Sequence, residues 1–178
     1  RSFNDKIHAA FEFFLSPNTN LKNHYYYLGR TKFIVLKYEI YSIVKQTIQN
    51  NFMNNNLQKD YDNEKFIFLP LHQEPERSLL IAAPYYTNQI ETIRNIAKSI
   101  PIDYKLYVKE HLTQGPARGG RDSSFYKKIL SIPNVRLLHP IVNSEKLIRD
   151  CSLVISVGGT ASFEAVFYEK PSIIFADL

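Results

Sequence analysis

The most constraining feature of the sequence is the segment 152–177, which reads SLVISVGGTASFEAVFYEKPSIIFAD. Its first apolar run, residues 153–157, stops at two consecutive glycines. An amphipathic segment follows with Phe163, Val166 and Phe167 at helical spacing, and a second apolar run begins after Pro171. Strand, glycine turn, helix and strand in this order predict one βαβ unit with parallel strands.

The turn in this unit predicts an anion site. Glycine lets the backbone approach a ligand closely, and the start of a helix offers N–H groups and a dipole that favour phosphate. The candidate binding residues are Gly158, Gly159, Thr160, Ala161, Ser162 and, for a ribose, Glu164. An ordinary strand-to-helix turn with a solvated glutamate explains the same residues. The turn is neither a P-loop nor a complete dinucleotide fingerprint.

The same rhythm extends backward to residue 65. Short apolar runs at 66–69, 105–109, 134–138, 153–157 and 173–175 alternate with helical patterns at 87–100, 123–130, 144–149 and from 160. This alternation predicts a Rossmann-like α/β domain over residues 63–178, with a parallel sheet and helices on both faces. Within residues 1–62, the spacing of apolar residues predicts helices at 2–15 and 31–52, and an Asn-rich linker follows. We interpret the chain as a fragment of a longer protein.

Polar residues cluster where the predicted strands end, and the ends of parallel strands share one edge. Lys109 and His111 follow the second strand and could neutralise a phosphate; His111 is the best candidate for a catalytic proton donor. Pro140 and Ile141 follow the third strand and could read a base through backbone groups. A surface charge cluster and a turn with a packed histidine are the plain alternatives. His72 and Glu74 lie in the first loop, at the same predicted edge, and solvent exposure is the plain alternative for both.

Composition narrows the partners. The net charge of +5 comes from scattered residues, which suits phosphate ligands or an anionic membrane surface and does not predict nucleic-acid binding. One cysteine, Cys151, indicates a reducing compartment such as the cytoplasm. No apolar run approaches the roughly 20 residues that a membrane span needs. The five histidines form no close-spaced pair, so no metal is expected.

Several motifs in succession resemble those of bacterial capsule or surface polysaccharide biosynthesis proteins, a family that includes Kdo transferases with a GT-B-like fold and CMP-linked sugar donors. The motifs are FLPLHQEPE at 68–76, YKLYVKEH at 104–111, SFY at 124–126, IPNVRLL at 132–138, GTASFEA at 159–165 and EKP at 169–171. The resemblance covers residues 65–178.

The resemblance implies the nucleotide-binding C-terminal half of a glycosyltransferase. His111 would match the family's His-Pro motif at the CMP phosphate, although Leu112 stands where the family usually has proline. Thr160 and Ser162 would supply phosphate-binding hydroxyls, and Glu164 the ribose-contacting acid. The implied partners are a nucleotide-sugar donor, with a CMP-sugar favoured, and a glycan or glycolipid acceptor.

No further cofactor is implied, and the location would be cytoplasmic or peripheral to the inner membrane. A nucleotide-sugar 2-epimerase, which shares the GT-B layout, and a non-catalytic binding or scaffold module are the alternatives.

Overall fold

The computed structural model describes residues 3–15, 32–62, 64–74, 78–112, 114 and 121–176. The chain divides into two compact units, Arg1–Val44 and Lys45–Leu178. The division falls earlier than the expected boundary after residue 62. The reason is that Met53 and Leu57, beyond the division, are buried in the core of the second unit.

The first unit contains α1 (Phe3–Leu15) and the beginning of α2 (Lys32–Asn56). Both helices were predicted, but α2 continues four residues beyond the expected end at residue 52, into the segment predicted as a linker. Asparagine is a weak helix former, and burial of Met53 explains why the helix persists there. No helix in the described part of the chain is long and apolar enough to cross a membrane.

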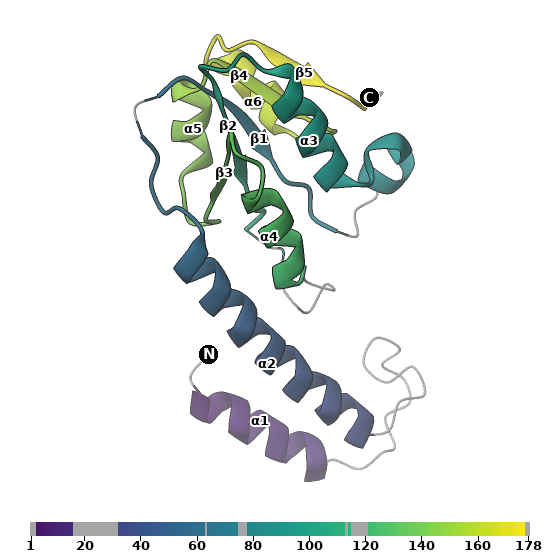
Figure 1. The fold of residues 1–178 in the computed structure, drawn as a ribbon. Coiled ribbons are helices and arrows are strands. Elements are labelled where there is room, and N and C mark those ends of the chain that lie inside the picture. The colour runs from purple at the N-terminus through teal and green to yellow at the C-terminus, as the bar shows by residue number, and fades with distance from the viewer. Residues whose placement is uncertain are drawn as a thin grey trace. The chain divides into compact units, whose positions relative to one another are not determined.

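The second unit contains a five-stranded sheet (Figure 1). Its strands are β1 (Phe66–Pro70), β2 (Lys105–Lys109), β3 (Val135–Leu138), β4 (Leu153–Ser156) and β5 (Ser172–Ile174). All four neighbouring pairs are parallel, and the spatial order is β3-β2-β1-β4-β5. This order is that of the first five strands of a doubly wound nucleotide-binding sheet. The predicted Rossmann-like α/β fold is therefore confirmed.

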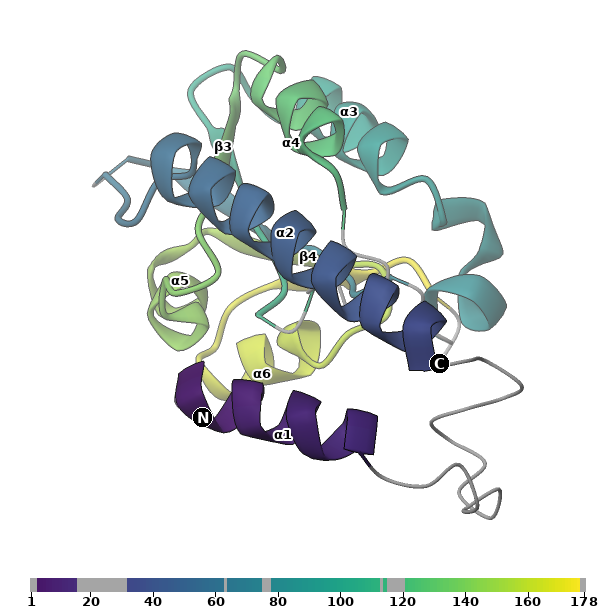
Figure 2. The same cartoon turned by 90° about the horizontal axis from the view of Figure 1, so that it is seen from below.

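Helices cover the sheet on both faces (Figure 2). They are α3 (Gln89–Ser99), α4 (Ser123–Leu130), α5 (Ser144–Asp150) and α6 (Ala161–Phe167). One face packs on α3, α4 and the end of α2, through side chains such as Leu69, Val108 and Ile129. The other packs on α5 and α6, through Phe68, Tyr107 and Leu147. Neighbouring strand residues therefore alternate between the two cores, as side chains on a pleated strand must.

Side-chain caps start three of these helices. Asn88, Asp122 and Asn143 each accept a hydrogen bond from a backbone N–H in the first turn of α3, α4 and α5. The cap of α5, Asn143, directly precedes the predicted start of that helix at residue 144. Each cap satisfies a backbone N–H that has no partner within its helix. These three polar residues therefore fix the residue at which each helix begins.

The strand order reverses between β1 and β4. From β1 the chain runs outward to β2 and β3 on one side, and it then crosses over to β4 on the other side of β1. In sheets of this type, ligands bind outside the carboxyl ends of the strands at such a reversal. The loop after β1 and the glycine turn after β4 flank this position.

Candidate nucleotide site

His72 joins the two loops at the reversal. It follows β1, and its Nε2 accepts a hydrogen bond from the N–H of Gly158, which follows β4, at 3.2 Å. The side chain is buried, so the plain alternative of solvent exposure does not hold for His72. The next amide of the turn, at Gly159, donates to Ser156 Oγ at 2.8 Å. Side chains thus hold the first two amides of the turn, which fixes its shape.

The start of α6 carries the groups that remain for a ligand. The first N–H groups of a helix, here at Ala161, Ser162 and Phe163, have no partner one turn back. Thr160 Oγ1 donates to Glu164 Oε1 at 2.8 Å, and both side chains are exposed. The hydroxyl and the carboxylate predicted to meet phosphate and ribose therefore lie side by side at the turn.

Ser162 faces the other way. Its side chain is buried, and Oγ lies 3.4 Å from the carbonyl oxygen of Ile173, to which it donates. Ser172 Oγ in turn donates to the carbonyl of Ser162 at 3.0 Å. The Ser162 hydroxyl therefore ties α6 to β5. This contradicts its predicted role at the phosphate and leaves only its backbone N–H as a candidate.

Lys109 ends β2 on the face covered by α5. Its Nζ is half-buried and donates to Ser144 Oγ at 2.5 Å. Burial lowers the pKa of this ammonium because the charged form loses hydration. Among the described residues, no carboxylate lies within salt-bridge distance of it. A bound anion beside Lys109 would restore the lost charge stabilisation.

The residues after β3 lie farther out. His139 is buried, and its Nδ1 accepts a hydrogen bond from the N–H of Ile141 at 3.3 Å. Burial, and next the charge of Lys59, lower the pKa of His139, which favours its neutral form. The Ile141 N–H is therefore already paired, and a base at Pro140 and Ile141 would meet carbonyls and an exposed isoleucine side chain. With about 4.8 Å between strands, β3 lies about 14 Å from β4, within the reach of a nucleotide.

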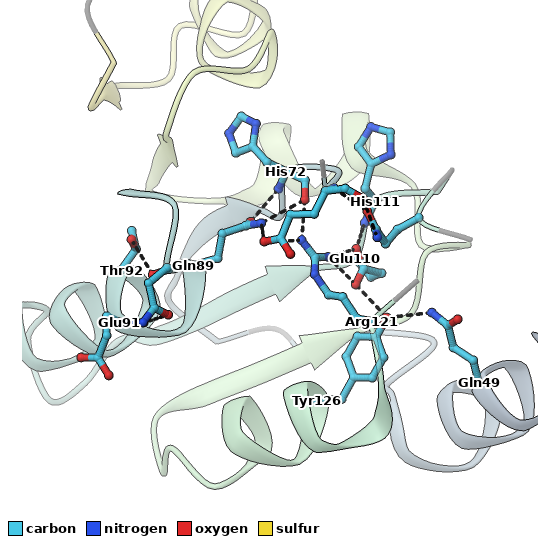
Figure 3. A network of polar contacts seen from close by, with 12 residues as sticks. Gln49, His72, Gln89, Glu91, Thr92, Glu110, His111, Arg121 and Tyr126 are labelled. Atoms are coloured by element: carbon cyan, nitrogen blue, oxygen red, sulfur yellow. Dashed lines mark hydrogen bonds and ion pairs between the residues drawn. The ribbon is translucent and has the colours of Figure 1, made fainter. Parts of the chain in front are cut away.

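A buried ion pair lies beneath the loops after β1 and β2 (Figure 3). Arg121 Nη1 donates to both oxygens of Glu110, at 2.6 and 2.7 Å, and the two side chains are 3% and 1% exposed. Tyr126 donates to the same carboxylate at 2.9 Å. Burial, and next the charge of Glu110, raise the pKa of Tyr126, so its hydroxyl stays a donor. A surface charge cluster was the plain expectation here, and Glu110 is instead fully buried.

The ion pair holds the backbone of both loops. Glu110 Oε1 accepts from the N–H of His111 at 2.6 Å, and Arg121 Nη2 donates to the carbonyl of His72 at 2.5 Å. The imidazole rings of His72 and His111 both point away from the Arg121 guanidinium, toward the same side (Figure 3). The His111 side chain is exposed, as a group that meets a ligand must be.

The structure thus brings together the ends of β1, β2 and β4. A separate cavity of about 550 Å³ lies along α3, with Tyr86, Thr92 and Phe175 in its wall, and none of the predicted binding residues lines it. Sequence reasoning missed Gln89, Arg121 and the burial of His72. A signal existed for Arg121, because a strand that ends in a buried acid needs a nearby cation.

Comparison with known proteins shows distant likenesses. No model of a protein family matches the chain, and no curated protein matches it. Among solved structures, it is similar to a Thermosulfurimonas dismutans protein, KpsC, a beta Kdo 2,7 transferase. That match has 16% identity, 82% of this chain and 45% of that one covered, and a TM-score of 0.49.

Two further similar structures have a UDP-sugar bound. A UDP-GlcNAc 2-epimerase from Neisseria meningitidis has 20% identity, 81% and 36% coverage and a TM-score of 0.46. HepE from Anabaena, in complex with UDP-glucose, has 16% identity, 75% and 32% coverage and a TM-score of 0.42. The chain spans less than half the length of these proteins. Because every TM-score here is below 0.5, the fold class stated above is based on this chain's own strand order and pairing.

Proposed function

We propose that this chain is the nucleotide-binding half of a GT-B glycosyltransferase that transfers a sugar from a nucleotide-sugar donor. One observation carries the proposal: the loop ends at the strand reversal present Lys109, His111, Thr160 and Glu164 on the edge where such sheets bind nucleotides. The motif resemblance supports a CMP-sugar donor and a role in capsule or surface polysaccharide biosynthesis, in the cytoplasm or at the inner membrane.

Phosphate recognition is assigned to two sources of positive potential. The first N–H groups of α6 point to the turn, and the Lys109 ammonium lies at the end of β2, two strands from β4. Transfer breaks the bond between the anomeric carbon and a phosphate oxygen, so negative charge develops on the leaving nucleotide. Donors already in place stabilise that charge without reorganisation. A metal is not required for this step, because these groups suffice in principle.

His111 and Glu164 have the remaining roles. The exposed imidazole of His111 would donate a hydrogen bond or a proton to the leaving phosphate. The Glu164 carboxylate, held by Thr160, would accept hydrogen bonds from ribose hydroxyls. The base that activates the acceptor hydroxyl is not assigned to this chain.

Titration calorimetry of the 178-residue chain with CMP and UDP tests the proposal. We expect binding, with CMP tighter than UDP, and a loss of at least tenfold in His111→Ala and Glu164→Ala, because each variant removes a hydrogen bond that involves a charged group. Glu145→Ala is the matched control, since Glu145 is an exposed acid on α5. A chain that is folded and binds neither nucleotide would overturn the proposal. Product analysis with an acceptor then separates transfer from 2-epimerisation.

A further inference from the structure

The backbone of His72 is held on both sides by buried side chains. Gln89 Oε1 accepts from its N–H at 2.9 Å, and its carbonyl accepts from Gln89 Nε2 at 3.1 Å and from Arg121 Nη2 at 2.5 Å. Counted over the whole residue, Gln89 and Arg121 are 4% and 6% exposed. A loop residue with both backbone groups bonded to buried side chains has little rotational freedom. The direction of its imidazole is therefore set by these partners.

Arg121 is fixed by its own contacts. Its guanidinium makes a two-bond contact with Glu110 and lies 4.5 Å from the centre of the Phe125 ring. The planar fork of a guanidinium directs its N–H groups at fixed angles. With Nη1 on the carboxylate, Nη2 is aimed at the carbonyl of His72. Glu110 is thereby connected to His72 through a single rigid group.

The contact continues from His72 into the glycine turn. Its Nε2 accepts from the Gly158 N–H, and its Cε1 would lie 3.3 Å from a Cβ at Gly159. Arg121 is on the β2 side of His72, and the turn is on the β4 side. The ion pair can therefore influence the turn through His72 and without touching it.

Stability alone does not account for such a pair. Removing two charges from water costs about as much as their attraction returns, and apolar replacements of buried ion pairs are often as stable. What an apolar pair lacks is direction. The Glu110–Arg121 pair gives a defined orientation to the backbone at His72 and His111, the two loop ends on which the candidate site depends.

We propose that Arg121 is a positioning residue of the nucleotide site: paired with Glu110, it orients His72, which holds Gly158 and keeps the glycine turn in the shape that receives a phosphate. The orienting step concerns the protein alone, and its consequence for ligands rests on the function proposed above.

The hydrogen bond between His72 and Gly158 can be observed directly. An N–H···N bond transmits a scalar coupling between its two nitrogens, which NMR of the ¹⁵N-labelled 178-residue chain detects. We expect this coupling in the unmodified chain and its loss in Arg121→Lys, because an ammonium lacks the fork that bonds Glu110 and His72 together. Gln89→Met, which introduces no charge change, removes the other support of His72 and should weaken the coupling too. Ile96→Val, in the α3 core, is the control that should keep it.

The same variants are then titrated with CMP. We expect Arg121→Lys to bind at least tenfold more weakly than the unmodified chain and Ile96→Val to bind within a factor of two. A coupling that survives in a folded Arg121→Lys overturns the positioning role of Arg121, and so does its absence from the unmodified chain. If the coupling is lost as expected while the unmodified chain binds no nucleotide, the positioning of the turn stands and the proposed function fails. Should Arg121→Lys not fold, the result for Gln89→Met decides.

Discussion

The imidazole of His72 accepts a hydrogen bond from the N–H of Gly158 although the two residues lie 86 positions apart. The bond connects the loop after β1 with the turn after β4, the two strands between which the sheet changes direction. Because Nε2 is the acceptor, it carries no proton in this arrangement, and the neutral ring has its proton on Nδ1. The structure of the glycine turn thus depends on one tautomer of a buried histidine.

Packing of His72 against Gly159 predicts that mutations at these two positions have non-additive effects on stability. A Cβ at residue 159 would lie 3.3 Å from His72 Cε1 and 3.4 Å from Ser156 Oγ, which requires the ring to shift. Gly159→Ala should therefore destabilise the chain, and the penalty should decrease in a His72→Ala background. We expect an interaction free energy of about 1 kcal/mol in a double-mutant cycle measured by urea unfolding. Equal penalties in both backgrounds would show that the ring does not oppose the added methyl group.

Glu110→Gln should strongly destabilise the fold. The substitution removes the buried charge that compensates Arg121 and leaves only the Glu74 carboxylate, which lies 3.4 Å from Arg121 Nη2 and is 36% exposed. Removing one partner of a buried pair costs about 3–5 kcal/mol, of which the more exposed Glu74 offsets only a part. Glu145→Gln is the matched control, because the Glu145–Arg149 pair has a similar distance, 2.5 Å, but lies in solvent. That change should cost less than about 1 kcal/mol. Urea unfolding measures the free energy of unfolding of both variants. Similar decreases in Glu110→Gln and Glu145→Gln would contradict the prediction.

Protonation of His139 should lower the unfolding free energy of the chain in mild acid. Burial and Lys59 lower its pKa below the ordinary value of 6.5, so between these two pKa values the unfolded chain binds more protons than the folded one. The contribution of His139 to stability is therefore constant above the ordinary pKa and decreases as the pH falls below it. In His139→Asn, the amide oxygen can still accept from Ile141 and does not titrate. The unfolding free energies of the two proteins should diverge between about pH 7 and pH 5; parallel curves would contradict the prediction.

The role proposed for Glu164 predicts that the chain distinguishes ribonucleotides from 2′-deoxyribonucleotides. If its carboxylate accepts a hydrogen bond from the 2′-hydroxyl, CMP should bind more tightly than 2′-deoxy-CMP, by about 1.5 kcal/mol or more for a bond to a charged group. Glu164→Ala should remove the difference. Thr160→Val, which removes only the hydroxyl that holds the carboxylate, should reduce it partially. Calorimetry with both nucleotides measures this, and equal affinities in the unmodified chain would exclude the ribose contact.

The sequence predicted the elements of the second unit closely. The strand at Lys105–Lys109 and the helix at Ser123–Leu130 have the predicted bounds, because apolar periodicity and the caps beside them are local signals. The end of α2 was predicted four residues too early. Its last turn is held by burial of Met53 in a distant core, which an Asn-rich composition does not reveal.

The candidate site was predicted only in part, because local sequence patterns locate the strand ends and do not set the direction of the side chains there. Parallel pairing places Lys109, Thr160 and Glu164 at one edge once the strands are identified, so their grouping follows from the sequence pattern. The direction of each side chain does not. The Ser162 hydroxyl bonds to the backbone of β5, and the His72 side chain is buried, which its place in a loop does not indicate.

The sequence alone determined that strands and helices alternate, since the spacing of apolar residues sets the local structure and the burial of each face. The tertiary structure alone decided the strand order, and with it which loops meet. Residues 72 and 158, which lie 86 positions apart, become partners only after the chain crosses over β1 and buries polar groups that must then find partners. Such pairings depend on contacts between distant segments, for which the local pattern carries no signal.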